Sequence, residues 1–506
     1  MLLIGIATLV RCFIAGFVGL GNDEVYYRMY AQYLQWNYFD HPPMVGWMIR
    51  LSTFNLFADH EFFIRLGAII SAAATTWLLF LSGKKLHNAY AGFLAAIIYT
   101  ATIYGSIIAG TFILPDSPQM VCWAAGLYLL TRITQYTNIT RVKKKDVLLF
   151  GIATGMGMLC KIHTSFLWLG FILYVLLYNR QWLVQPVFYI SGIITIFIFY
   201  PVIQWNINNH FITYLYHSNR VNITEGGFDP ATFFTFAAGQ VFYCNPVIFI
   251  FFIPVTIAAL KNNLPLLLSQ KRLLLFCSLP LILAATVISF FKPVLPHWPG
   301  PAYSGLILLT ACYFSKQKEK TTSTKIQVPK PLWTAAAFLC LLVTAGIILV
   351  NFMPGTLGKK DKTILGDGDF TLDMYGWADF KKSFNQIVET DMRSGVMPAN
   401  ALIISNKWFP AAHLDYYAAL PLKKDLIAIG DTNDIHQYAW INTERKKLQA
   451  GDDAYCIVPS NNYFDVKNMY GPYFNTILSP QAIEQKRNST ICRRFYIWRL
   501  KNYTGK

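Results

Sequence analysis

Three carboxylates, a histidine and several aromatic residues gather near the N-terminus of an otherwise apolar chain. They directly follow the first apolar segment and are Asp23, Glu24, Tyr26, Tyr27, Asp40 and His41. A carboxylate can take the proton from an attacking hydroxyl group, and such a base typically accelerates a reaction about 10²–10⁴-fold. We therefore predict that the chemistry takes place here.

A second set of polar residues adjoins apolar segments farther along the chain. These residues are Arg65, Asp116, Lys161, Lys292 and His297, and His163 shares a short loop with Lys161. Charges at the level of a membrane are costly unless they are used or paired. The cations would stabilise a departing lipid-borne phosphate while a carboxylate accepts a proton. The sequence has no glycine-rich phosphate loop, HExxH motif or GxSxG motif that would indicate a nucleotide site, a zinc protease or a serine hydrolase.

Each candidate also has a purely structural interpretation. Asn22 or Asp23 suits the N-cap of a surface helix, and Asp116 suits the N-cap of the apolar segment that follows it. Asp40 and His41 precede two prolines and can anchor a rigid loop. Basic side chains near helix ends often bind lipid phosphates or extend toward the headgroups. The convergence of the candidates on one membrane face, more than any single residue, indicates a reaction centre.

The composition is that of a polytopic α-helical membrane protein. Of the 506 residues, 54% are hydrophobic and 14% are charged, against roughly 25% charged residues in soluble proteins. Eleven apolar segments are predicted to cross a bilayer. They span residues 2–19, 62–82, 90–110, 116–133, 147–160, 164–178, 184–204, 238–260, 273–291, 298–314 and 331–352. The first contains Arg11 and lacks a small-residue cleavage site, so it is interpreted as an uncleaved helix and not a signal peptide.

Basic residues predict the orientation of these segments. Lysine and arginine concentrate in alternate loops, at residues 83–85, 141–145, 179–180, 271–272 and 316–320. Because cytoplasmic loops are enriched in these residues, the N-terminus is predicted inside the cytoplasmic membrane and the C-terminus outside it. The same loops account for much of the formal net charge of +17, so nucleic acid is excluded as a partner and membrane lipids are expected instead.

The composition becomes polar near Asn351, which predicts two domains. Residues 1–352 would form the membrane domain, with surface helices in its outward loop 20–61, and residues 353–506 a soluble α/β domain. Within the second domain, strands are predicted at 401–405 and 454–458 and helices near 377–385 and 409–417. Cys456 and Cys492 can pair if this domain lies in an oxidising compartment.

Several motifs resemble those of a known family. The stretch Asp23–Tyr27 followed by Tyr38–Pro43 is similar to the first outward loop of bacterial glycosyltransferases related to protein O-mannosyltransferases. That group has the GT-C fold and includes the aminoarabinose transferases of lipid A. The stretches Leu114–Pro118, Leu159–Lys161 and Pro296–Tyr303 match in the same order across most of the membrane region.

The resemblance implies transfer of a sugar from a polyprenyl phosphate to an acceptor hydroxyl on the periplasmic or outer side. The acceptor would be a glycolipid such as lipid A, another glycan or a protein, and the reaction a single displacement with inversion. Asp23 would be the general base, Glu24 would orient it, and Asp116 would support substrate binding.

The resemblance also implies roles for the remaining candidates. The donor phosphate would be held by Lys161 and, with it, Lys292, His297 and Arg65. The substrates would further contact Tyr26, Tyr27, Asp40 and His41. Some members of the family bind a divalent metal near these carboxylates, and the candidate ligands here are His41 and His297.

Two other classes of protein also contain many membrane helices. A transporter or flippase of lipid-linked sugars would place charges or broken helices near the bilayer midplane and would show related halves. Neither feature is evident, because the polar residues cluster at one predicted surface. A structural membrane protein with an exported binding domain would not need the acidic and basic residues of the outward loops.

Overall fold

The computed structural model describes residues 1–136, 138–319 and 327–505 and divides the chain into two compact units. The first comprises Met1–Ala15 and Leu34–Leu342, and the second comprises Gly16–Tyr33 and Val343–Lys506. The predicted boundary near residue 352 divides the chain into two continuous domains. The compact units differ from it because residues 16–33 pack with the C-terminal part of the chain.

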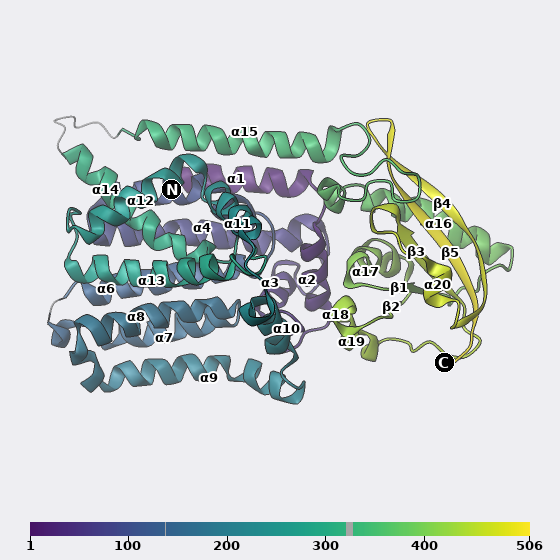
Figure 1. Ribbon diagram of the computed structural model, residues 1–506, viewed down its shortest axis with the longest axis horizontal. Coiled ribbons are helices and arrows are strands. Elements are labelled where there is room, and N and C mark those ends of the chain that lie inside the picture. Colours follow the sequence, from purple (N-terminus) through teal and green to yellow (C-terminus); the bar gives the residue numbers. More distant parts are fainter. Residues whose placement is uncertain (137, 320–326, 506) are drawn as a thin grey trace. The chain divides into compact units, whose positions relative to one another are not determined.

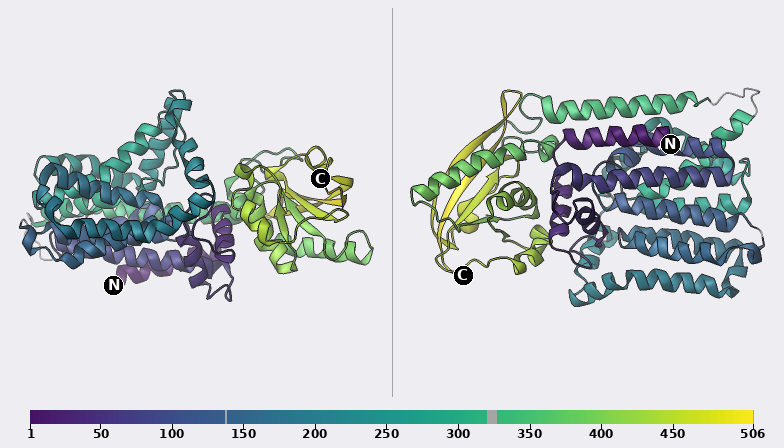
Figure 2. Two further views of the ribbon diagram at one scale, coloured as in Figure 1. Left: turned by 90° about the horizontal axis from the view of Figure 1, so that it is seen from below. Right: turned by 180° about the vertical axis from the view of Figure 1, so that it is seen from behind.

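The first unit is built of helices, several of which run side by side (Figures 1 and 2). They are α1 (Leu2–Phe17), α3 (Met44–Ser52), α4 (Glu61–Leu86), α5 (Ala89–Ala101), α6 (Asp116–Thr134), α7 (Lys144–Met158), α8 (Ser165–Tyr178), α9 (Pro186–Asn208), α10 (Ile212–Val221), α11 (Pro230–Tyr243), α12 (Pro246–Leu260), α13 (Leu268–Ile288), α14 (Tyr303–Glu319) and α15 (Lys330–Phe352). The last residues of α1 and α15 belong to the second unit. Each of the eleven predicted segments therefore contains a helix.

Four of the described helices are long and apolar enough to cross a membrane by themselves, namely α4, α9, α13 and α15. The number is six if α1 with α2 and α11 with α12 each count as one bent span. The segment predicted at 238–260 is thus not one straight helix. It bends by 100° between α11 and α12, where Asn245 has a φ of +69° and Pro246 starts the next helix. Proline at this first position costs no hydrogen bond.

Two further predictions differ from the structure in detail. The segment predicted at 90–110 leaves the α-helix after Ala101 and continues as a π-helical turn, Tyr104–Ile108. The loop between the predicted segments 184–204 and 238–260 contains α10. The surface helices predicted in loop 20–61 include α3, and Lys320 of the predicted basic loop lies outside the described residues.

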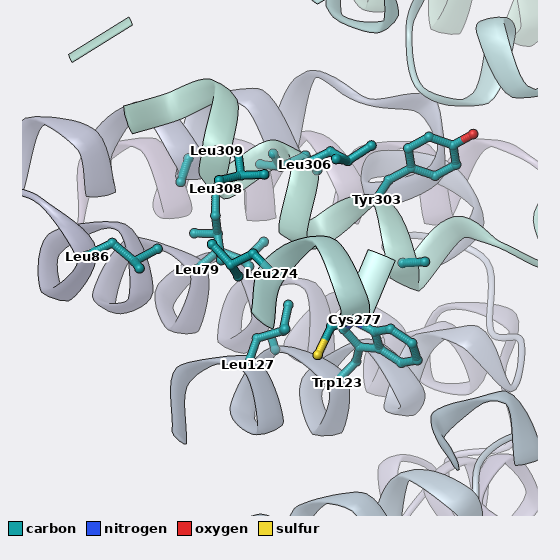
Figure 3. Close-up of a cluster of buried hydrophobic side chains, with 14 of the residues drawn as sticks. Leu79, Leu86, Trp123, Leu127, Leu274, Cys277, Tyr303, Leu306, Leu308 and Leu309 are labelled. Atoms are coloured by element: carbon teal, nitrogen blue, oxygen red, sulfur yellow. The ribbon is translucent and has the colours of Figure 1, made fainter. Parts of the chain in front are cut away.

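The core of the first unit lies between α4, α6, α13 and α14. Figure 3 shows Leu79 from α4 near Trp123 and Leu127 from α6, with Leu274 from α13 and Leu308 from α14 beside them. Close packing also needs small residues, since a Cβ on Gly83 of α4 would lie 2.8 Å from the Cα of Gly92 in α5. Such close approach is how membrane helices gain packing energy where lipid is as apolar as the side chains.

The second unit is an α/β structure around one mixed sheet, as predicted. Its helices are α2 (Asn22–Gln32), α16 (Trp377–Arg393), α17 (Trp408–Leu414), α18 (Thr432–Ile435), α19 (Tyr438–Ile441) and α20 (Val466–Tyr470). Its strands are β1 (Leu402–Ser405), β2 (Leu426–Ala428), β3 (Ala454–Pro459), β4 (Phe474–Arg487) and β5 (Thr490–Tyr503). The strand order is β2-β1-β3-β5-β4, with β1 parallel to β2 and β3 and the other pairs antiparallel.

The sequence explains the arrangement of this sheet. The strands β1 and β3 are apolar and buried throughout, as expected for central strands covered on both faces. The long hairpin of β4 and β5 turns at Asn488 and Ser489, which both have positive φ angles and match a two-residue hairpin turn. Cys456 and Cys492 lie in different strands as free thiols, so the disulfide considered from the sequence does not form.

A buried ion pair fastens this hairpin to the segment that follows α15. Arg487 Nη2 lies 3.1 Å from Asp369 Oδ2, and both side chains are fully buried. The same guanidinium donates to the carbonyls of Gly355 and Val350 at 3.0 and 3.1 Å. Removing one partner of such a pair leaves an uncompensated buried charge.

We expect Arg487→Met to destabilise the second unit by about 3–5 kcal/mol, measured as the free energy of unfolding in detergent. Arg494→Met is the matched control, because Arg494 pairs with the half-exposed Glu484 and the loss should stay within about 1 kcal/mol. Equal effects of the two substitutions would contradict the role given to the buried pair.

Candidate functional site

A buried ion pair joins Asp116 to Lys161 in the first unit. Lys161 Nζ donates to Asp116 Oδ2 at 2.9 Å, and the two side chains are only 4% and 2% exposed. The Tyr104 hydroxyl donates to the other carboxylate oxygen, Oδ1, also at 2.9 Å. The carboxylate thus has a charged partner and a neutral one, which offsets the cost of burying it.

Local structure explains why these three side chains meet. Pro115 takes the N-cap position of α6, so Asp116 is its first residue and does not cap it as the structural interpretation suggested. Lys161 follows α7, whose last turn accepts its backbone N–H at the Gly157 carbonyl. Tyr104 opens the π-helical turn, and π-turns are frequent at functional sites.

Gly300 makes room for Tyr104. A Cβ added to Gly300 would overlap the Tyr104 ring, so the ring lies directly against the backbone of the loop before α14. Tyr104 and Gly300 also line a small hollow with room for about one water molecule, together with Tyr99, Met120, Tyr243 and Tyr303. The Asp116–Lys161 pair therefore adjoins an apolar hollow through Tyr104.

Four histidines from separate segments lie in the same region as this pair. They are His41 before α3, His163 before α8, His217 in α10 and His297 before α14. The rings of His41 and His217 lie 5.9 Å apart, and His217 Nε2 is 2.7 Å from the Asp40 carbonyl oxygen. The histidines, Lys161 and Arg220 act electrostatically on one another, so they share one region of the unit.

Burial and the nearby cations keep these imidazoles neutral. Burial, with Lys161 next in effect, lowers the pKa of His297 to about 4. Burial also lowers the pKa of His41 well below its usual value, and His217, Lys161, His297 and Arg220 add to the effect. Near neutral pH, the positive charge here comes from Lys161 and Arg220, and the imidazoles supply hydrogen bonds.

Aromatic rings hold Arg220 in place. Its guanidinium carbon lies 5.3 Å from the ring centre of Trp298 and 5.5 Å from that of Tyr216. The ring of His163 lies 5.8 Å from Trp298. Cations stack on aromatic faces with a gain of about 0.5–2 kcal/mol, so this guanidinium is ordered before any anion arrives.

His217 and Arg220 were missed by the sequence analysis. Both lie in α10, in the loop between the predicted segments 184–204 and 238–260, where no helix was expected. This loop alternates with the basic loops, so the prediction places it outside. Their presence in an outward loop is the same signal that selected Lys161 and His297. The helix is tied to the first outward loop by Asn37, whose amide donates to Thr213 Oγ1 at 2.8 Å.

Two predicted cations of the first unit have other contacts. Arg65 is fully buried in α4, donates to the Ala15 carbonyl at 3.2 Å and lies over the Phe112 ring. Lys292 packs beside Gly226, where an added Cβ would lie 3.1 Å from Lys292 Cε. Neither contact joins these residues to the Asp116–Lys161 pair, so their phosphate-binding role stays a prediction.

Four predicted residues lie on α2 in the second unit: Asp23, Glu24, Tyr26 and Tyr27. Glu24 is buried, and its Oε2 accepts the backbone N–H of Gly21 at 2.9 Å. Gly21, and neither Asn22 nor Asp23, is thus the N-cap residue of this helix. That these residues share a pocket with the Asp116–Lys161 pair stays a prediction.

The predicted metal site gains no support from the geometry. Across residues 1–136, 138–319 and 327–505, no group of three or more His, Cys, Asp or Glu residues is placed to hold a metal ion. His41 and His297 share their region with the ammonium of Lys161 and the guanidinium of Arg220. These positive charges would repel a divalent cation and favour an anion.

Comparisons with known proteins connect this site to a family. Residues 40–205 match the family model of dolichyl-phosphate-mannose-protein mannosyltransferase, a range that includes Asp116 and Lys161. The crystal structure of ArnT from Cupriavidus metallidurans bound to undecaprenyl phosphate aligns with 98% of this chain and 97% of its own, with a TM-score of 0.62 and 14% identity. The chain has the GT-C fold.

Two sequence relatives are also named as glycosyltransferases. The lipid A galacturonosyltransferase RgtD of Rhizobium johnstonii is 22% identical over 288 residues, which cover 56% of this chain and 59% of that protein. The undecaprenyl phosphate-alpha-4-amino-4-deoxy-L-arabinose arabinosyl transferase of Serratia proteamaculans is 30% identical over 125 residues, 24% of this chain and 22% of that protein. The matches thus span 59% and 22% of these relatives' lengths, and they support the resemblance to aminoarabinose and lipid A transferases.

We expect Gly300→Ala to push the Tyr104 ring away from Asp116 and to destabilise the first unit by about 1–3 kcal/mol. The measurement is the free energy of unfolding in detergent. Gly192→Ala in α9 is the matched control, because nothing lies within 4 Å of an added Cβ there. The same change at both glycines would contradict the close approach of Gly300 and Tyr104.

Proposed function

We propose that this protein is a membrane glycosyltransferase that moves a sugar from a polyprenyl-phosphate donor to the hydroxyl of an acceptor. The acceptor is lipid A, another glycolipid or glycan, or a protein. The observation that carries the proposal is the Asp116–Lys161 pair surrounded by Arg220 and four imidazoles. A dense group of cations and neutral hydrogen-bond donors suits a phosphate ester.

In this proposal the donor phosphate lies against Arg220, Lys161 and the imidazole N–H groups. The acceptor oxygen attacks the anomeric carbon from the side opposite the phosphate, and the bond from that carbon to the phosphate oxygen breaks. The electron pair of the broken bond leaves with the polyprenyl phosphate, and the configuration inverts. The cations stabilise the charge that develops on the leaving phosphate, so no general acid is needed.

Asp23 is the proposed general base. It receives the proton of the acceptor hydroxyl as the new bond forms, and Glu24, by capping α2, holds the helix that carries it. Asp116 remains ionised beside Lys161 and orients the ammonium toward the donor. These roles rest on the family resemblance for Asp23 and on the described contacts for Asp116.

The relatives support this class of donor and acceptor. One solved structure of the same fold contains undecaprenyl phosphate, and one sequence relative is named for lipid A. We further propose that the site faces the periplasm, with the N-terminus in the cytoplasm and the C-terminal domain outside.

A transporter of lipid-linked sugars is the alternative, and the placement of the charges argues against it. Asp116 begins α6, Lys161 follows α7 and His297 precedes α14, so all three lie at helix ends. A transporter would bind its substrate near the middle of broken helices. The decisive experiment asks whether the purified protein releases free polyprenyl phosphate from a labelled donor when an acceptor is added.

We expect Asp23→Asn to abolish sugar transfer, by at least about 10²-fold in kcat, because the amide cannot accept the acceptor proton. The folded fraction and the donor affinity should match the unmodified protein. Near-normal turnover in this variant would remove Asp23 from the role of base.

Lys161 calls for a double substitution, because Lys161→Met alone leaves Asp116 buried without its counter-charge. We expect the single variant to lose about 3–5 kcal/mol of stability and Lys161→Met with Asp116→Asn to recover most of it. Donor KM should rise on the order of 10–100-fold in both, with acceptor KM little changed. Lys84→Met, at the exposed end of α4, is the control. An unchanged donor KM in the double variant would refute the phosphate-binding role.

A further inference from the structure

The helix α2 is packed against the C-terminal domain along its whole length. It begins beside Met374, where an added Cβ on Gly19 would lie 2.5 Å from the Met374 carbonyl oxygen. At the other end, Tyr33 just past the helix accepts a hydrogen bond from Arg445 Nε at 2.9 Å. The two segments are far apart in sequence, yet they form one compact unit.

The first anchor of α2 is Asn22, the residue before Asp23. Its Oδ1 lies 2.9 Å from Nε2 of His413, which is fully buried. The oxygen can only accept, so Nε2 carries the proton and donates. Burial, with a contribution from Arg493, lowers the pKa of His413 well below its usual value, which keeps the ring neutral.

His413 has little freedom to move. Its ring is stacked between Trp377, with ring centres 4.3 Å apart, and Tyr417, with centres 5.9 Å apart. The guanidinium of Arg493 lies 4.3 Å over the Trp377 ring. Asn22 also forms a hydrogen bond with Asp373, a carboxyl whose pKa burial raises to about 6.

Two more anchors follow along α2. The Tyr26 hydroxyl accepts the backbone N–H of Gln437 at 3.0 Å, and its ring lies 5.0 Å from Trp408. Tyr33 meets Arg445, which is held in turn by Asp415 at 2.6 Å. Positions 22 and 26 are four residues apart and share one face of the helix, and Tyr33 directly follows its last residue.

We infer that the C-terminal domain positions the carboxylates of α2, and that His413 is a positioning residue that acts on Asp23 through Asn22. The inference rests on the proposed function for the role of Asp23. It gives the C-terminal domain a part in the reaction itself, because the domain holds the backbone that carries the base. A base displaced by about 1 Å can lose about 10²-fold in rate.

The test compares two substitutions of His413. His413→Phe keeps an aromatic ring between Trp377 and Tyr417 and removes the hydrogen bond to Asn22. His413→Gln can place an amide N–H near the position of Nε2 and so serves as the conservative rescue. Asn22→Ala removes the same bond from the other side.

The first measurement is hydrogen–deuterium exchange of the full-length protein in detergent. In His413→Phe and Asn22→Ala we expect faster exchange of the α2 amides, with unchanged exchange in β1 and β3. His413→Gln should restore protection of α2. Loss of protection throughout the sheet, or no change in α2, would overturn the inference. This readout needs no activity, so it decides the positioning role even if the proposed sugar transfer fails.

The second measurement is steady-state kinetics with a polyprenyl-phosphate donor. In His413→Phe we expect kcat to fall about 10–100-fold while donor KM stays within about twofold, and His413→Gln to retain most of the rate. Combining His413→Phe with Asn22→Ala should lose no more than Asn22→Ala alone, since Asn22→Ala already removes the bond to His413 together with the one to Asp373. Normal kcat in His413→Phe, or additive losses in the double variant, would overturn the inference.

Discussion

The buried pair of Asp116 and Lys161 is the constraint on which the first unit depends. A carboxylate and an ammonium of such low exposure each need the other, and neither can be placed by its own helix alone. The ion pair therefore holds the start of α6 against the end of α7. Tyr104, from a π-helical turn, donates a hydrogen bond to the same carboxylate. Gly300 then follows, because only a residue without a side chain leaves space for the Tyr104 ring.

The region around this pair has the chemistry of an anion site. Burial keeps His41 and His297 neutral, so they can donate hydrogen bonds without adding like charges that would repel one another. The fixed charges come from Lys161 and from Arg220, which aromatic rings already orient. In the proposed function, a site prepared in this way would lose little entropy on binding a phosphate.

In the second unit, polar contacts likewise hold segments that are far apart in sequence. Asn22, Tyr26 and Tyr33 each have a partner in the C-terminal domain. Stacking holds His413, the partner of Asn22, and an ion pair holds Arg445, the partner of Tyr33. A short helix of eleven residues is marginal alone, so its order comes from this packing. In the proposed function these are two tasks, since the helical unit would hold the donor phosphate and the C-terminal domain holds the acidic helix.

The sequence by itself determined the membrane class, the places of the apolar helical segments and the α/β nature of the C-terminal domain, because hydropathy and short apolar strand segments are local signals. It also selected Asp116, Lys161, His41 and His297, because polar and charged residues beside apolar segments are costly and can be recognised in the sequence. Only the tertiary structure decided that Tyr104, His217 and Arg220 join them, that Pro115 and not Asp116 caps α6, and that α2 packs with the C-terminal domain. Apart from the N-cap of α6, those outcomes depend on contacts between separate segments of the chain, which spacing in a single sequence does not encode.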